Sequence, residues 1–154
     1  MEYNRNKPEK DFVKRTIEMA EEFKNHKYGT TAQINFLFGT IILPKSHWYN
    51  SLKQYSIKLN EIPGVSIVYK DYQQISLKVL LHCLRNGIAH WKENGNQNID
   101  FVTVQNTKGE KEIKKVIIKG TGKVDKKVEN VEVTFDVDQD GLVEFMKKIY
   151  DYLK

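Results

Sequence analysis

The spacing of hydrophobic residues changes along this chain, and that change limits the folds available to it. Up to about residue 91, apolar residues recur every three or four positions, which is typical of amphipathic helices. From Ile99 to Phe135 they alternate every second position, which indicates β-strands. After Asp138 the helical spacing returns. We therefore expect an α+β fold in which helices, an antiparallel sheet and one last helix follow each other.

The helical part is expected to occupy residues 8–91. Pro8 and the acidic residues after it favour a helix start. Thr30 or Thr31 is expected to cap the second helix, which Pro44 ends. The segment Val65–Tyr69 is ambiguous and is compatible with a short extended piece. The expected helices run over about 8–25, 32–43, 47–59 and from about Asp71 to Trp91, the last with Leu77, Leu80, Leu81, Leu84 and Ile88 on its core face.

The second part predicts a three-stranded antiparallel β-meander over residues 99–137 and a C-terminal helix over 139–153. Strands are expected at 99–104, 113–118 and 131–135, with turns at 106–109 and at Gly120-Thr121-Gly122. Asp138 or Asp140 is expected to cap the final helix. All 154 residues suit a single domain with one core.

The composition indicates the cellular location of the protein and the charge of its possible partners. The single cysteine, Cys83, lies in an apolar helical stretch and is expected to be a buried core thiol without a disulfide partner. No N-terminal stretch resembles a signal peptide, and the longest apolar run, Ile34–Leu43, is about half of the ~20 residues that a membrane span needs. We expect a cytoplasmic protein. Its net charge of +5 permits a polyanionic partner.

The residues with the clearest chemistry end the fourth expected helix, in the stretch from Arg85 and Asn86 to His90. Histidine titrates near neutral pH and can therefore accept or donate a proton. Arginine stays charged and presents a fork of donors to phosphate oxygens. RNA carries its own nucleophile, the 2′-hydroxyl, so cutting it needs a base, an acid and a positive charge at the phosphate, and no metal.

Helical geometry leaves the role of this motif open. Arg85 and His90 lie about 140° apart on an ideal helix. They converge only if the helix ends near Gly87, or if a two-fold dimer brings two copies of each into one cleft. The alternative is structural: Arg85 offsets the charge of a helix C-terminus, and His90 binds a terminal carbonyl. Asn86 either orients the site or faces water.

The sequence around this motif, residues 75–91, resembles the HEPN superfamily, whose signature is Arg, a polar residue that is often Asn, a few small or apolar residues and His. Arg85, Asn86 and His90 match these positions. The resemblance implies a helical bundle and a metal-independent endoribonuclease without a cofactor, acting as a homodimer. It also implies a toxin or defence effector, with an antitoxin or another defence protein as a further partner. The alternative is a non-catalytic HEPN dimer that binds nucleotide, RNA or a protein.

Other signals are weaker. Lys114, Lys115 and Lys119 in the meander either guide RNA or keep a sheet edge solvated. The segment Asp136–Gly141 looks like the start of a calcium loop, but Lys147 stands where a bidentate glutamate is needed, so we interpret it as a helix cap. His82 and Cys83 point to different helix faces, which argues against a zinc site with His90.

Overall fold

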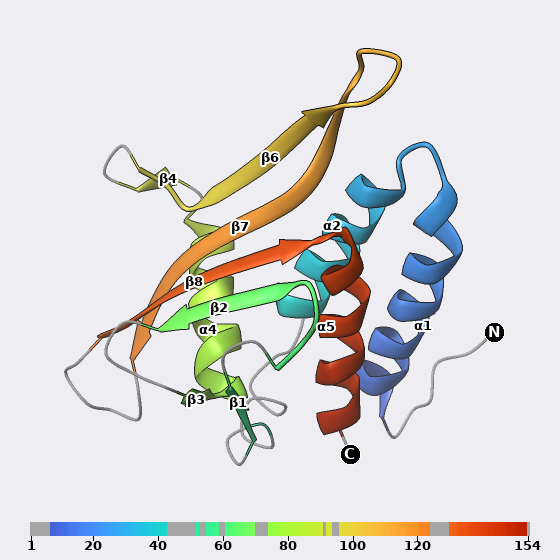
Figure 1. Ribbon diagram of the computed structural model, residues 1–154. Coiled ribbons are helices and arrows are strands. Elements are labelled where there is room, and N and C mark those ends of the chain that lie inside the picture. The colour runs from blue at the N-terminus through green and yellow to red at the C-terminus, as the bar shows by residue number, and fades with distance from the viewer. Residues whose placement is uncertain are drawn as a thin grey trace.

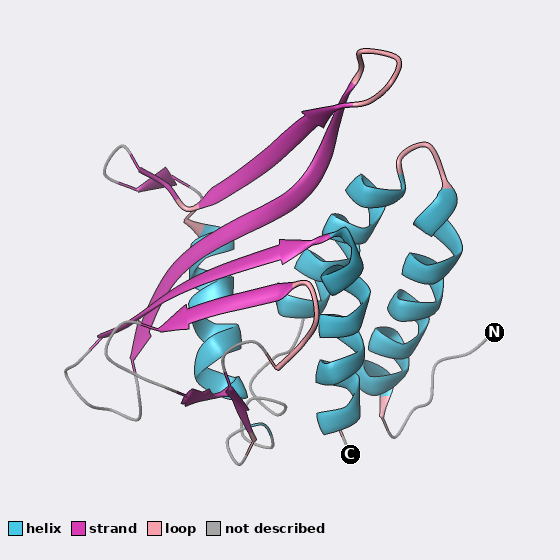
Figure 2. Ribbon diagram, in the orientation of Figure 1, coloured by secondary structure: helices cyan, strands magenta, loops and turns pink. Residues whose placement is uncertain are grey.

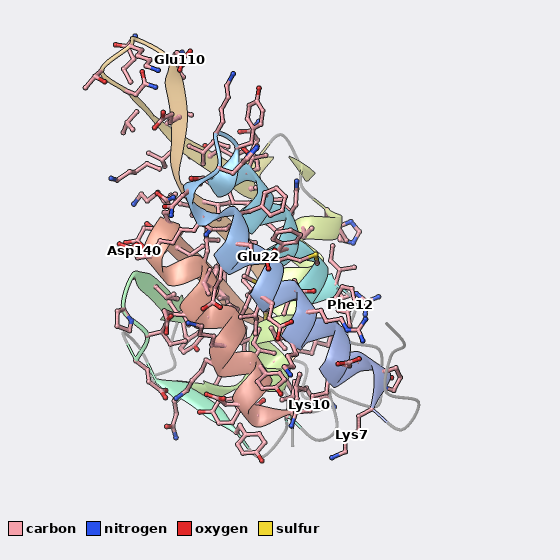
Figure 3. All side chains as sticks on the ribbon, turned by 90° about the vertical axis from the view of Figure 1, so that its right-hand side faces the viewer. Lys7, Lys10, Phe12, Glu22, Glu110 and Asp140 are labelled. Carbon is pink, nitrogen blue, oxygen red and sulfur yellow. The ribbon has the colours of Figure 1, made fainter. Side chains whose placement is uncertain are left out.

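A four-stranded antiparallel sheet forms the centre of the computed structural model, which describes residues 7–42, 52, 55–58, 61–69, 74–90, 92–93, 96–123 and 130–153 (Figures 1 and 2). The strands lie in the order β2 (Val65–Tyr69), β8 (Asn130–Asp138), β7 (Lys111–Lys123) and β6 (Ile99–Gln105). β6, β7 and β8 form a meander, and β2 adds a fourth strand beside β8. The β6–β7 hairpin projects beyond the helices, with Glu110 near its tip (Figure 3).

The helices form two groups. α1 (Pro8–Glu22), the short 3₁₀ turn η1 (Phe23–Asn25), α2 (Gly29–Ile42) and α5 (Gln139–Tyr152) pack together beside one end of the sheet. α4 (Leu77–Ala89) lies by contrast across the sheet and packs mainly on β7. Two small antiparallel pairs complete the described elements: β1 (Ser56–Lys58) with β3 (Gln74–Ser76), and β4 (Lys92–Glu93) with β5 (Asn96–Gln97).

Burial follows the alternation of the strands. In β8 every second residue from Val131 to Val137 is buried, as the period of two requires for one core-facing side. Phe135 of this strand contacts Phe145 of α5, with ring centroids 4.7 Å apart. The strand and the helix that follows it therefore share one core, to which α4 adds its leucine-rich face.

Several expectations are confirmed. The fold is α+β, the first helix with its 3₁₀ extension covers residues 8–25, and the core thiol Cys83 is fully buried. Asp138 caps α5, because its Oδ1 accepts a hydrogen bond of 2.9 Å from the backbone N–H of Gly141. The ambiguous segment Val65–Tyr69 is a strand and makes the sheet four-stranded instead of three-stranded.

Other expectations are wrong, each for a local reason. The second helix begins at Gly29, so Thr30 and Thr31 lie in its first turn and do not cap it. The helix expected over 47–59 falls largely outside the described residues, and its end, Ser56–Lys58, is a strand paired with β3. The fourth helix begins at Leu77 because Ser76 is extended and caps it through a 3.3 Å hydrogen bond from the Val79 N–H.

The turn expected at Gly120-Thr121-Gly122 does not exist. β7 runs through these residues as far as Lys123, paired with β8 throughout. A Cβ on Gly120 would overlap the backbone carbonyl of Cys83, and one on Gly122 would lie 2.8 Å from the Cys83 Sγ. These glycines therefore let α4 approach the strand closely, and they do not reverse the chain.

Candidate active site at the edge of strand β7

The motif residues lie at the C-terminal end of α4. The helix continues through Gly87 to Ala89, and His90 is its C-cap, with φ −111° and its backbone N–H 2.9 Å from the Asn86 carbonyl oxygen. The helix therefore does not end near Gly87, which was one of the two conditions for Arg85 and His90 to converge. A Cβ on Gly87 would overlap the Lys119 carbonyl oxygen, so this glycine serves contact between helix and strand.

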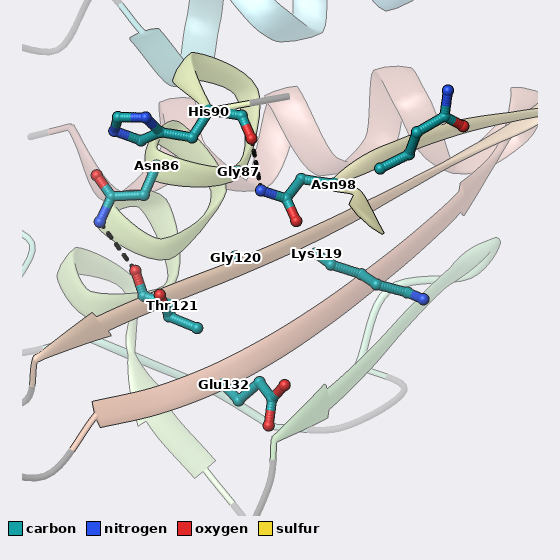
Figure 4. A pocket seen from close by; sticks show the side chains of 9 residues that line it. Asn86, Gly87, His90, Asn98, Lys119, Gly120, Thr121 and Glu132 are labelled. Atoms are coloured by element: carbon teal, nitrogen blue, oxygen red, sulfur yellow. Dashed lines mark hydrogen bonds between the residues drawn. The ribbon is translucent and has the colours of Figure 1, made fainter. Parts of the chain in front are cut away.

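Two asparagines connect the end of α4 to the sheet. Asn86 Nδ2 donates to the carbonyl oxygen of Thr121 at 2.8 Å, and Asn98 Nδ2 donates to the carbonyl oxygen of His90 (Figure 4). The Lys119 N–H in turn donates to the Asn98 carbonyl oxygen at 2.8 Å. The backbone of His90 is therefore tied through Asn98 to β7, while Asn86 occupies part of the edge of that strand.

A cleft of about 730 Å³ opens at this edge. Among the described residues, β6 pairs with β7 only as far as Ile118, so the following residues of β7 face Asn86 and Asn98. The cleft wraps around the strand edge, with α4 on one side and outward-facing side chains of β7 and β8 on the other (Figure 4). Its lining residues are Asn86, Gly87, His90, Gln97, Asn98, Lys119, Gly120, Thr121 and Glu132.

The structure brings three of the predicted site residues together and leaves the others apart. Asn86, His90 and Lys119 line the cleft. Arg85 is exposed on α4 but is not among the described residues that line it. Lys115 pairs with Asp136, whose Oδ2 lies 2.7 Å from its Nζ. Lys114 is exposed near the irregular register of β6 and β7 and outside the cleft.

Sequence reasoning missed Asn98, Thr121 and Glu132 as members of this cleft. No local pattern marks them, because they meet the motif only through strand register. It also missed a role for His82, which lies one turn before Asn86 on the exposed face of α4. Its Nε2 lies 3.4 Å from Asn86 Nδ2. His82 and the Thr121 carbonyl oxygen therefore both contact the side-chain amide of Asn86. The i, i+4 spacing of these two residues was a usable signal.

The other sites considered from sequence have structural explanations. Lys147, at the twelfth position of the calcium-like loop, pairs with Glu21 at 2.8 Å and with Glu144 at 3.0 Å. Within the described part of the chain no three His, Cys, Asp or Glu side chains gather where they could hold a metal ion. Burial raises the pKa of the Cys83 thiol to about 12, which keeps it protonated.

Among the residues that the structure describes, no helix is long and apolar enough to cross a membrane.

The chain thus has an α+β fold in which an Arg-Asn-x₃-His motif ends a core helix beside a polar cleft. The chain belongs to the HEPN family described as HEPN pEK499 p136, whose family model matches residues 1–154. No curated protein and no solved structure matches the chain. Membership of a HEPN family indicates a nuclease or nucleotide-binding role in general.

Proposed function

We propose that the protein is a metal-independent endoribonuclease in which His90 transfers protons at the cleft on the β7 edge. The observation that carries the proposal is the position of His90, which is exposed and lines one polar cleft together with the exposed Lys119 (Figure 4). A cleft with a proton-transfer group and a cation suits a phosphodiester. The protein would act on cytoplasmic RNA as a toxin or defence effector, held in check by an antitoxin or another defence protein.

The chemistry needs no cofactor. The ribose 2′-oxygen attacks the adjacent phosphorus as a base takes its proton, and the bond from phosphorus to the 5′-oxygen breaks as an acid gives that oxygen a proton. The products are a 2′,3′-cyclic phosphate and a 5′-hydroxyl end. Neutral histidine is the base and protonated histidine the acid. Developing charge on the phosphoryl oxygens requires a cation, which is the role of arginine.

A homodimer supplies what one chain lacks. Arg85 lies about 140° around α4 from His90, and it is absent from the cleft of its own chain. A two-fold arrangement of α4 helices would bring Arg85 of the partner subunit to this cleft and place both His90 side chains in one site. Asn86 would hold the strand edge in place for this arrangement, through its bond to the Thr121 carbonyl.

A second candidate function follows from the same observation. If Arg85 never reaches a cleft, the chain is a non-catalytic HEPN dimer that binds nucleotide, RNA or a protein partner. The two functions differ in their products, because only the first breaks the RNA chain. The alternative also allows His90 to be replaced without loss of function, provided that Asn98 still fixes the end of α4.

The test is cleavage of single-stranded RNA in excess EDTA, with the ends analysed for cyclic phosphate. We expect wild-type activity to persist, and His90→Ala and Arg85→Ala to lose it while they remain folded and dimeric. His26→Ala is the matched control, since His26 is exposed at the α1–α2 corner away from the cleft. Activity that disappears with chelator and returns with magnesium would contradict the metal-independent mechanism. Full activity of the His90→Ala homodimer would refute the assignment of His90.

Mixed dimers test the composite site. A heterodimer of His90→Ala and Arg85→Ala chains retains one histidine and one arginine, and it recovers part of the activity if only one of each is essential. If both histidines are needed it stays inactive, whereas a dimer of wild-type and Arg85→Ala chains keeps some activity. Full activity of an isolated monomer would exclude the composite site.

A further inference from the structure

A second hollow continues the cleft onto the outer face of the sheet. It measures about 170 Å³ and is lined by Gln97, Asn98, Asp100, Ile117 and Lys119. Gln97, Asn98 and Lys119 also line the larger cleft, so the two hollows are adjacent. A ligand bound beside His90 can therefore extend past Lys119 without leaving the protein surface.

Strand register explains why these side chains meet. Asp100 and Ile117 are directly paired in β6 and β7, and side chains of such a pair lie on the same face. Lys119 is two residues further along β7, so it shares that face. The neighbouring residues Val116, Ile118 and Gly120 are buried against the core, which places the hollow on the opposite face of the sheet.

The three outer residues offer three different interactions. The Lys119 ammonium is an exposed point charge that suits a phosphate. Ile117 is half-buried and provides an apolar surface for a flat ring. The exposed Asp100 carboxylate accepts hydrogen bonds and cannot donate them. Because a carboxylate repels phosphate, a nucleotide here must turn its base and not its backbone towards Asp100.

We propose that this hollow is a subsite for the nucleotide that flanks the scissile phosphate, and that Asp100 selects its base. Lys119 binds the phosphate of this flanking nucleotide, and the base of the nucleotide lies on Ile117. Asp100 accepts hydrogen bonds from an amino group on the edge of that base. Adenine, cytosine and guanine present such a group. Uracil presents a single N–H between two carbonyl oxygens, which repel the carboxylate. The subsite rests on the proposed function in so far as the cleft holds RNA.

The experiment measures binding and not cleavage. Fluorescence anisotropy is recorded with 2′-O-methyl hexamers of A, C and U, which lack the nucleophile and cannot be cut. We expect the wild-type dimer to bind the A and C hexamers about tenfold more tightly than the U hexamer, on the scale of one base-edge contact. Asp100→Asn should reduce this preference to less than about twofold, because an amide also donates to the uracil carbonyls.

Two lysine variants separate the phosphate contact from base selection. Lys119→Gln should weaken all three hexamers alike and lower the salt dependence of binding by about one counterion. Lys111→Gln is the matched control on the same strand, because Lys111 is exposed at the start of β7 and lines neither hollow, and it should leave binding of all three hexamers unchanged. Thermal unfolding of each variant checks that the fold is kept.

The outcomes distinguish the two proposals. If unmodified RNA is cut but the wild-type protein binds A, C and U hexamers equally, the subsite proposal is overturned and the nuclease stands. If RNA is not cut but the base preference is present and Asp100→Asn abolishes it, the subsite stands and the nuclease assignment falls. A preference that survives in Asp100→Asn assigns base selection to another residue and overturns the role of Asp100.

Discussion

Gly87 of the motif helix allows a quantitative test of how α4 meets the sheet. A methyl group added at Gly87 overlaps the Lys119 carbonyl oxygen and lies 3.1 Å from the Ile118 Cγ2. The first obstacle is backbone in the middle of a paired strand, so it cannot move aside as the end of a flexible side chain would. Overpacking typically costs 1–3 kcal/mol, and this geometry places Gly87→Ala at about 3 kcal/mol.

Helix propensity acts in the opposite direction. Alanine is favoured over glycine inside a helix by about 1 kcal/mol, so the net loss for Gly87→Ala is about 2 kcal/mol. For a chain of this length that corresponds to a fall in Tm of roughly 4–8 °C. Gly39 in α2 provides the matched control, since nothing lies within 4 Å of a Cβ placed there. Gly39→Ala should raise Tm by about 2–4 °C.

Scanning calorimetry on both variants decides between two accounts of Gly87. If the glycine permits close packing, the two substitutions shift Tm in opposite directions. If it only loosens the helix before His90, both substitutions stabilise the protein. A Gly87→Ala variant as stable as Gly39→Ala would therefore refute the close contact between α4 and β7.

Two further predictions follow from single residues. Asn98→Ala cannot donate to the His90 carbonyl and should lower kcat about 10- to 100-fold with little change in KM, because it removes the bond without adding a charge to the cleft. Asn106→Ala, at the tip of the β6–β7 hairpin, should leave kcat unchanged, and steady-state kinetics on an RNA substrate checks both. Burial raises the pKa of Cys83 from 9.0 to about 12, so above pH 9 the unfolded chain loses a proton that the folded chain keeps, and stability falls as pH rises through this window. Urea unfolding from pH 8 to 11 should show this fall, and Cys83→Ala should reduce its slope.

Local patterns predicted those features that depend on local interactions. The change of hydrophobic period identified the helical and strand regions, and the Asp138 cap was recognisable because capping involves residues three positions apart. The leucine stripe located α4 for the same reason. Its start was misplaced because Gln74–Ser76 form a short strand paired with β1, and the helix begins only after Ser76, which caps it.

Glycine was the main source of error. Gly120 and Gly122 fit a turn by composition, and Gly87 fits a helix break, yet all three are sites where α4 and β7 approach each other. A missing Cβ serves turns and close contacts equally well, and only the tertiary partner distinguishes them. The small β1–β3 pair was missed for a related reason, since a strand of three residues depends on its partner more than on its own propensity.

The candidate site also contains residues that a local pattern could identify and residues that only the tertiary structure brings together. Arg85, Asn86 and His90 are adjacent in sequence and could be named together, but the cleft also needs residues from three strands or their flanks. β6 begins at Ile99, which pairs with Ile118 of β7. The preceding residue, Asn98, is therefore placed opposite Lys119, whose N–H donates to the Asn98 carbonyl oxygen. Had β6 begun earlier, its backbone would cover the edge of β7 that Asn86 now contacts, and His90 would face a continuous sheet. The start of one strand therefore creates the opening beside the motif, and the length of β6 is as much a part of the site as the side chains that line it.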